Sequence, residues 1–338
     1  MNKSDTSNAP PPLNEGWFCE EFGDYQNLSV KPIAEGKPGV GQVLIKNQVF
    51  ALGFPDLLMV QGKYQLKPSL PFVLGTELCG TVIGTGGGVD KNLVGTNVMG
   101  TVRFGAASKL VVAEVSDCIK LPPKWSFSEG AAFLVAYKTA YVGLVARGKL
   151  HPTDKVLVLG ASGGVGLAAV RLAKHFGATV YGVVKGKNKM LTVLDKGADY
   201  VVDIDQIELR SEIKRLTKNR GVDVVFDPVG GALFEDSVRC LAPFGRMLVI
   251  GFASGVIPKF SINYALIKQL SIIGVRAGEY GRQNQEGGMH VMQELTRLIE
   301  TGKIEPEVYQ TLDWHELKQG FASIENREVI GRVTIACE

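Results

Sequence analysis

The first third of the chain alternates short apolar stretches with turn-forming residues. QVLIKNQVF (42–50), GTVIGTGG (80–87) and KLVVAEVS (109–116) are rich in Val, Ile and Leu, and Gly, Pro and Asn separate such stretches from one another. Runs of this length between turn residues are typical of β-strands, and helical periodicity is scarce. From about residue 28 to 120 the pattern therefore predicts a compact β-rich unit.

The pattern changes at residue 126. The stretch 126–150 opens with Ser126 or Ser128 as possible N-caps and continues with apolar and small residues, which is typical of a buried helix. Apolar strands then alternate with helices, which indicates a parallel sheet covered on both faces in a doubly wound α/β domain. The predicted strands are 155–160, 178–184, 199–204, 222–230, 246–252 and 270–275, and the predicted helices are 166–176, 187–197 and 207–219.

The end of the chain sets the domain limits that we expect. Residues 289–303 have the pattern of one more helix, and short strands follow, ending in GRVTIACE (331–338). We expect these strands to return to the β-rich unit and to make it discontinuous. The predicted organisation is a disordered lead-in over 1–14, a β-rich domain over 15–128 and 290–338, and a doubly wound domain over 129–289.

Composition and charge argue against several classes of protein. The 338 residues carry a formal net charge of +3 without a Lys/Arg block, which gives no positive case for nucleic-acid or membrane binding. The N-terminus lacks a signal-peptide pattern, and the longest uncharged run, 156–170, is too short to span a bilayer. The five cysteines are scattered without a C-x-x-C motif, which fits a reducing compartment. We therefore expect a cytoplasmic protein.

The most informative stretch, LGASGGVG (159–166), lies between a predicted strand and a predicted helix. Glycines at such a place allow a tight turn and a close approach to a pyrophosphate, and the helix N-terminus offers unpaired N–H groups. The pattern predicts a dinucleotide site, although a tight turn without a ligand is the alternative. The candidate ligands in this loop are Gly160, Ser162, Gly163, Gly164, Val165 and Gly166.

The end of the next strand indicates which dinucleotide binds. An NAD site has Asp or Glu about 20 residues after the glycines to hold the ribose 2′-hydroxyl. This chain has Lys185, Lys187 and Lys189 there, and no acid between Val183 and Met190. Positive charge suits a 2′-phosphate, so the pattern favours NADPH, with Lys185 and Lys189 as candidate ligands. The alternative is a solvated, basic start of a helix.

These features together resemble the medium-chain dehydrogenase/reductase superfamily, and within it the zinc-free quinone oxidoreductase branch that includes zeta-crystallin. The resemblance covers almost the whole chain after the first dozen residues, and it implies a GroES-like β domain, a Rossmann domain, NADPH as hydride donor and a homodimer. The stretches that carry it are FPDLLMVQGKY (54–64), LPFVLGTELCGTV (70–82), EGAAFLVAYKTAY (129–141), 156–178, GVDVVFDPVGG (221–231) and GRMLVIGFASG (245–255).

The resemblance also bears on metal binding. Zinc-dependent relatives have His-Glu where this chain has Thr76-Glu77, and a thiolate near Leu52-Gly53. A zinc site needs at least three converging protein ligands, and all four histidines are distant from this segment in the sequence. We therefore expect no metal site. Glu77 is expected to be a buried carboxylate hydrogen-bonded to backbone, and Cys79 a small core residue.

Five further residues are candidates, two of them by the same resemblance and three by their place in the chain. Tyr64 matches a tyrosine thought to face the acceptor, and Asp56, in the same loop, is a weaker catalytic candidate; each could instead order its loop. Thr139 matches a position near the nicotinamide carboxamide, or it packs its helix. Gly251 and Phe252 follow a strand end, where ligands bind on such sheets, although Phe252 could belong to the core.

Two positions depart from the family pattern. Relatives usually have Asn at position 53, where it lines the cleft between cofactor and acceptor, and this chain has Gly53. Relatives often have an aromatic residue or His near position 204 that touches the adenosine phosphate, and Ile204 has no such polar group. The first departure bears on how the acceptor is placed, and the second on how NADPH is held.

Three functions remain open at this stage. The first is an NADPH:quinone reductase, in which a hydrogen-bond donor stabilises the charge that develops on the acceptor oxygen. The second is an NADPH-dependent enone or 2-alkenal reductase, which needs the same cleft. The third is a nucleotide-binding protein with a structural or RNA-binding role. The strand LSIIGV (270–275) could pair with its copy and form a homodimer across the Rossmann sheet edge.

Overall fold

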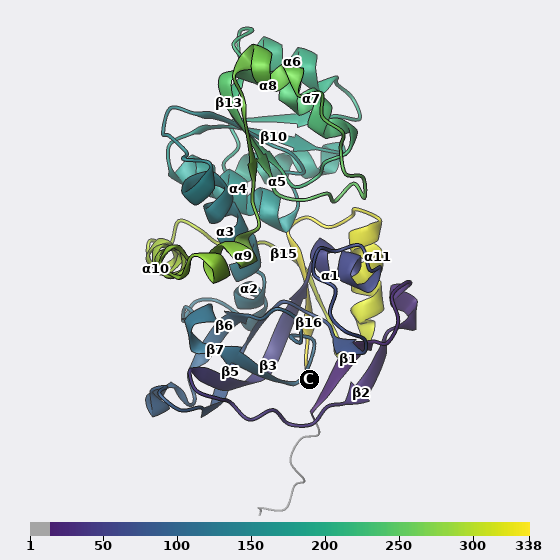
Figure 1. The fold of residues 1–338 in the computed structure, drawn as a ribbon, viewed down its shortest axis with the longest axis vertical. Coiled ribbons are helices and arrows are strands. Elements are labelled where there is room, and N and C mark those ends of the chain that lie inside the picture. The colour runs from purple at the N-terminus through teal and green to yellow at the C-terminus, as the bar shows by residue number, and fades with distance from the viewer. Residues whose placement is uncertain (1–13) are drawn as a thin grey trace, which may run out of the picture.

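The computed structural model describes residues 14–338, so the predicted lead-in lies outside the described residues except for Asn14. Asn14 is buried, and its Oδ1 accepts a hydrogen bond of 2.9 Å from the backbone N–H of Leu110. Figure 1 shows two lobes, a β-rich lobe drawn below and an α/β lobe drawn above. Both parts of the predicted fold class, the parallel α/β sheet and the GroES-like β domain, are confirmed by this architecture.

The lower lobe is built around a seven-stranded sheet in the order β15-β16-β3-β5-β6-β8, with β7 also paired to β3. Turn residues divide this part of the chain into short strands, as its pattern predicted. One helix, α1 (Phe54–Val60), interrupts the β pattern, because Gly53 and Pro55 start a turn that the apolar residues continue. The strands are β3 (Gln42–Leu52), β5 (Glu77–Thr85), β6 (Asn97–Thr101), β7 (Leu110–Glu114) and β8 (Cys118–Lys120), beside a smaller sheet of β1 (Glu15–Cys19), β2 (Ser29–Pro32) and β4 (Phe72–Val73).

The C-terminal tail completes the lower sheet. Strand β16 (Arg332–Ala336) pairs antiparallel with β3 and parallel with β15 (Val308–Leu312). Along the chain, these two strands are separated by a helix that the sequence pattern did not predict, α11 (Leu317–Glu325). The yellow tail in Figure 1 therefore descends from the upper lobe into the lower sheet. The domain limits drawn from the sequence stay a prediction.

The upper lobe contains a six-stranded parallel sheet in the order β11-β10-β9-β12-β13-β14. The chain adds strands on one side of β9 and then returns to add them on the other, so the strand order reverses between β9 and β12. The predicted strands are thus confirmed. They are β9 (Lys155–Val158), β10 (Thr179–Val184), β11 (Tyr200–Asp203), β12 (Val222–Asp227), β13 (Leu241–Val249) and β14 (Ser271–Gly274).

Helices cover this sheet and join it to the lower lobe. The predicted helix over 126–150 is divided into α2 (Phe127–Ala131), α3 (Leu134–Tyr141) and a π-helical segment (Val142–Arg147). One apolar core runs from Cys79 and Met99 in the lower sheet to Val156 in the upper sheet. The remaining helices are α4 (Gly164–His175), α5 (Met190–Asp195), α6 (Leu209–Leu216), α7 (Ala232–Cys240), α8 (Asn263–Lys268), α9 (Ala277–Gln283) and α10 (Gln285–Glu300).

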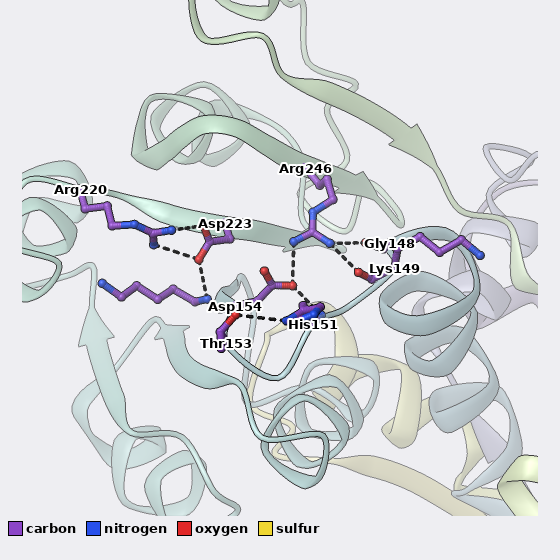
Figure 2. Close-up of polar contacts among 9 residues, drawn as sticks. Gly148, Lys149, His151, Thr153, Asp154, Arg220, Asp223 and Arg246 are labelled. Atoms are coloured by element: carbon purple, nitrogen blue, oxygen red, sulfur yellow. Dashed lines mark hydrogen bonds and ion pairs between the residues drawn. The ribbon is translucent and has the colours of Figure 1, made fainter.

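A polar network holds the amino ends of the parallel strands, on the side of the sheet away from the glycine loop (Figure 2). The guanidinium of Arg246 donates to the carbonyls of Gly148 and Lys149 at 2.6 and 2.7 Å, and to the carboxylate of Asp154 at 2.7 Å. Asp154 also accepts from the N–H of His151 at 2.7 Å. This network fastens the loop before β9 to strand β13.

Candidate active site

A large cleft lies between the two lobes at the carboxyl ends of the parallel strands. Its volume is about 1710 Å³, and residues of both lobes line it. The predicted cofactor residues all line this one cleft, although they come from four separate segments of the chain. They are Thr139, Gly160, Ser162, Gly163, Gly164, Val165, Gly166, Lys185, Lys189, Gly251 and Phe252, and the acceptor candidate Tyr64 lines it as well.

The glycine loop has a backbone that side chains would block. Gly160 has a φ of +58°, in the left-handed region that glycine adopts most readily. A Cβ added at Gly166 would lie 2.2 Å from the carbonyl oxygen of Gly160, so the turn closes only with glycine there. Gly163 is the N-cap of α4, a twelve-residue helix. The first-turn N–H groups of α4 can therefore hold a pyrophosphate without obstruction by side chains.

The C-terminal tail contacts this loop directly. The N–H of Gly331 donates to the carbonyl of Ser162 at 2.8 Å, and a Cβ added at Gly164 would lie 2.3 Å from Cδ of Arg332. This contact could not be predicted from the sequence, because nothing local links residues about 170 positions apart. The loop is therefore held from one side by strand β16 of the lower lobe.

Basic residues gather where β10 ends. Lys185 is largely exposed and lies 3.7 Å from the carboxylate of Asp205. Lys189 donates from Nζ to the carbonyl of Arg327, and Arg327 lines the same cleft. Burial lowers the pKa of Lys189, and the charge of Arg327 lowers it further. Arg327 is a candidate ligand that the sequence analysis missed, and its proximity to Lys189 is the signal that identifies it.

Tyr64 lines the cleft from the lower lobe. It is partly buried against the core of the lower lobe, just after helix α1. Burial raises its pKa, and the carboxylate of Asp56 raises it further, while Arg276 and Arg282 oppose the rise. The phenol therefore stays protonated at neutral pH and can donate a hydrogen bond to an acceptor oxygen.

The structure gives Asp56 a different position from the predicted one. Asp56 lies in the first turn of helix α1 and not in a loop, and it is 1% exposed. Its Oδ2 accepts from the N–H of Gly53 at 2.8 Å, which caps the helix. Asp56 is absent from the lining of the cleft. Asp56 therefore orders the turn around Pro55, which was the alternative to its catalytic role, because the apolar run after Pro55 forms a helix that turns this carboxylate inward.

Glu77 and Arg332 form a buried ion pair, with side chains 1% and 7% exposed, and Arg332 also lines the cleft. The other carboxylate oxygen of Glu77 accepts from the N–H of Val135 at 2.8 Å, so the predicted backbone hydrogen bond is confirmed. Burial raises the pKa of Glu77 to about 7, against the opposing charge of Arg332. The partner Arg332, 255 residues further on, was not predicted.

Cys79 lies in the core, as predicted, and burial raises the pKa of its thiol. No group of three or more His, Cys, Asp or Glu side chains in residues 14–338 is arranged to hold a metal ion.

The two departures from the family pattern both line the cleft. A Cβ added at Gly53 would lie 2.7 Å from Nη1 of Arg332, so the guanidinium occupies space that a side chain at position 53 would need. The polar group at this place in the cleft is therefore an arginine from the tail. Ile204 presents an apolar side chain beside the end of β11.

Three comparisons place this architecture among known proteins. A family model described as the alcohol dehydrogenase GroES-like domain matches residues 39–123, and one described as a zinc-binding dehydrogenase matches residues 164–297. The quinone oxidoreductase-like protein 2 homolog of Nematostella vectensis is 33% identical over 94% of this chain and 87% of its own length. The human synaptic vesicle membrane protein VAT-1 homolog is 30% identical over 93% of this chain and 84% of its own length.

A solved structure agrees with the sequence relatives. The Escherichia coli quinone oxidoreductase, complexed with NADPH, superposes with a TM-score of 0.87 at 27% identity, covering 95% of this chain and 99% of that chain. The chain therefore belongs to the medium-chain dehydrogenase/reductase superfamily of oxidoreductases, in its zinc-free quinone oxidoreductase branch. Within residues 14–338, no helix has the length and apolar character needed to cross a membrane.

Proposed function

We propose that the protein reduces quinones with NADPH. The observation that carries this proposal is that one cleft contains both an open glycine loop at the start of α4 and a protonated phenol, Tyr64. The first feature suits a dinucleotide, and the second suits an acceptor whose oxygen becomes negative. The similarity to the E. coli structure, a quinone oxidoreductase complexed with NADPH, supports the same pairing.

The choice of NADPH over NADH rests on charge. Lys185 follows the end of β10, where no acidic residue is present to hold a ribose 2′-hydroxyl, and Lys189 and Arg327 line the cleft nearby. These cations can pair with a 2′-phosphate. Lys189 has one hydrogen bond to the Arg327 carbonyl, and its ammonium has two further N–H groups for a phosphate.

The residues of this chain then bind and orient the reactants. The glycine loop and the N-terminus of α4 hold the pyrophosphate, while Thr139, Gly251 and Phe252 form the wall where the nicotinamide end would lie. When bound, NADPH supplies the hydride. Tyr64 donates a hydrogen bond to the acceptor oxygen on which negative charge develops, and the partly buried position of its ring makes that bond stronger than it would be in water.

An enone or 2-alkenal is the second candidate acceptor, because hydride transfer to its β-carbon also places negative charge on an oxygen within reach of a donor such as Tyr64. The two functions differ in the acceptor and not in the part of the cleft that binds the cofactor.

The deciding measurement is NADPH oxidation at 340 nm by EDTA-treated protein, with a 1,4-naphthoquinone and a trans-2-alkenal in parallel and NADH as the control donor. We expect turnover of the quinone that survives the chelator and prefers NADPH. Turnover of the alkenal alone would move the function to enone reduction. Absence of turnover with both acceptors would refute the catalytic proposal and favour a nucleotide-binding role without catalysis.

A further inference from the structure

A group of three arginines surrounds one glutamate at the acceptor side of the cleft. The carboxylate of Glu279 lies 2.7 Å from Arg282, 3.6 Å from Arg103 and 3.8 Å from Arg276. The side chain of Glu279 is 19% exposed, whereas those of the three arginines are 43 to 53% exposed. One carboxylate thus orders three guanidinium groups and neutralises only one of them, which leaves an excess charge of two. We name these four residues the arginine group.

The arginine group belongs to both walls of the cleft. Arg103 follows β6 in the lower lobe, while Arg276 and Arg282 belong to the segment of α9 at the junction of the lobes. All four members line the cleft together with Tyr64. The charges of Arg276 and Arg282 lower the pKa of Tyr64 against the effect of burial, and the charge of Glu279 raises it, so the arginine group lies within electrostatic range of the phenol. The arginine group therefore belongs to the space in which an acceptor would meet Tyr64.

The other acidic residues of the cleft wall do not offset this charge. Asp117 lies 3.3 Å from the ammonium of Lys138, and Glu114 accepts a hydrogen bond of 2.7 Å from Gln42. Both lie in the β7 to β8 region of the lower lobe.

The position of the arginine group separates it from the proposed phosphate contacts of the cofactor. Lys185 follows β10, whereas Arg276 follows β14, on the other side of the point where the strand order reverses. Four strand spacings separate β10 from β14, which amounts to about 19 Å across the sheet. A 2′-phosphate held by Lys185 and Lys189 cannot also account for three arginines at the far end of the cleft.

We propose that the natural acceptor carries an oxyanion, a carboxylate or a phosphate, and that Arg276 and Arg282 bind it while the reducible ring or double bond lies at Tyr64. This inference rests on the proposed function and specifies its substrate class. Guanidinium groups suit such an oxyanion because their planar N–H groups pair with two of its oxygens at once. A cleft with low-dielectric walls and excess positive charge also concentrates anionic substrates.

The test compares acceptors that differ only in charge. The first pair is a 1,4-naphthoquinone with a propanoate side chain and the methyl ester of the same compound, in which the methylene groups insulate the ring from the charge. The second pair carries a phosphate monoester or a free hydroxyl on an ethyl side chain. At saturating NADPH, we expect kcat/KM for the anionic member of at least one pair to exceed that of its neutral member on the order of fivefold, as suits partly exposed ion pairs. The ratio should fall towards one as NaCl is raised, because salt screens these charges.

Variants assign the preference to the arginine group. In the Arg276→Gln/Arg282→Gln double variant, the anion-to-neutral ratio should fall to about one, and in Glu279→Gln it should rise above the wild-type ratio, because the excess charge increases. Arg297→Gln is the matched control, since Arg297 forms a similar i,i+3 pair with Glu294 and is absent from the cleft lining. This control should leave the ratio unchanged.

The outcomes separate the two proposals. If the neutral ester is reduced and neither pair shows a preference, or if the preference survives in the double variant, the oxyanion site is refuted and the reductase proposal stands. If no acceptor is reduced, the reductase proposal fails. Calorimetric titration of wild type and Glu279→Gln with the naphthoquinone propanoate and its ester then tests the site alone, and equal affinities for the two compounds would refute it.

Discussion

At the level of single residues, the site depends on a buried cluster of Asp56, Glu77 and Arg332. Glu77 pairs with the guanidinium of Arg332, whose charge also acts on Asp56, and none of the three side chains is more than 7% exposed. Oδ1 of Asp56 and Nε of Arg332 lack hydrogen-bond partners in the described part of the chain. Because one positive charge faces two possible negative charges in a medium of low dielectric constant, the cluster binds a proton more tightly than isolated carboxyl groups do.

Replacing Asp56 by Asn should reduce the dependence of stability on pH. Burial raises the pKa of Asp56 from 3.8 to about 6, so between these values the folded protein binds a proton that the unfolded chain releases. The resulting stabilisation is fully present below pH 3.8 and is lost as the pH rises through 6, an effect of at most about 3 kcal/mol. Glu77 acts in the same direction up to pH 7.

Urea unfolding at pH 5, 6, 7 and 8 measures this effect. We expect the free energy of unfolding of Asp56→Asn to fall less over this range than that of the wild type. Asp195→Asn is the control, because Asp195 is exposed at the end of α5. Parallel pH profiles for Asp56→Asn and wild type would contradict the assignment.

Tyr64→Phe removes only the hydroxyl of the proposed donor. Loss of one hydrogen bond to a developing oxyanion lowers kcat by roughly 100- to 1000-fold. The affinity for NADPH, measured by fluorescence titration, should stay unchanged, because the loop at α4 is untouched. Tyr309→Phe is the matched control, because it removes a hydroxyl from an exposed tyrosine on strand β15. A variant with full kcat would exclude a role for the hydroxyl of Tyr64 in catalysis.

At the level of elements, the parallel sheet is held at both ends of its strands. The carboxyl ends carry the cleft, and the amino ends carry the network of Arg246 (Figure 2). Arg246 binds the carbonyls of Gly148 and Lys149, just after the π-helical segment that follows α3. The end of a helix carries a partial negative charge, so the guanidinium is favourable there. This contact fixes the start of β9, whose other end leads into the glycine loop.

Arg246→Met should therefore destabilise the protein without changing the chemistry of the cleft. The change leaves the carbonyls of Gly148 and Lys149 without this donor and leaves Asp154 with the N–H of His151 alone, which costs about 2 kcal/mol. Urea unfolding checks this value. Arg215→Met, which breaks an exposed pair with Glu212, should destabilise the protein much less. Equal losses in the two variants would show that the network of Arg246 is no stronger than a surface pair.

At the scale of the whole molecule, the exposed edge of the upper sheet is available for pairing with a second copy of the chain. Strand β14 ends the sheet, with Ile272 40% exposed, and Leu266 and Ile267 on the neighbouring helix α8 are 80% and 70% exposed. An edge strand has unpaired backbone groups, and exposed apolar side chains beside it are typical of an interface. We predict a homodimer in which two copies of β14 pair and form one twelve-stranded sheet.

Light scattering coupled to gel filtration tests this prediction. The mass should be twice the 36.4 kDa of one chain. Ile272→Lys should shift the protein to the monomer, because a charge on the edge strand opposes pairing. Ile207→Lys is the control, since Ile207 is similarly exposed but follows β11 at the opposite end of the sheet. A monomeric wild type would refute the prediction.

The sequence by itself determined the features that depend on near neighbours. The alternation of apolar strands and helices predicted the parallel sheet, and the glycines between Gly160 and Gly166 predicted the loop, because period and turn chemistry are local properties. Short helices were harder to predict. Helix α9 contains Gly278 and Gly281, and α1 stands within a strand-like stretch, so tertiary packing decided both.

Only the tertiary structure decided which distant groups meet in the cleft. Arg332 joins Glu77 across 255 residues, and Arg103 meets Glu279 across the two lobes. Asp56 is turned into the interior by a helix that its local pattern did not predict. Burial and charge pairing depend on chain segments that come together only on folding, whereas periodicity and turn chemistry depend on residues that are close in the sequence. The class of protein could therefore be predicted from the sequence, while the charges that select its acceptor became visible only in the fold.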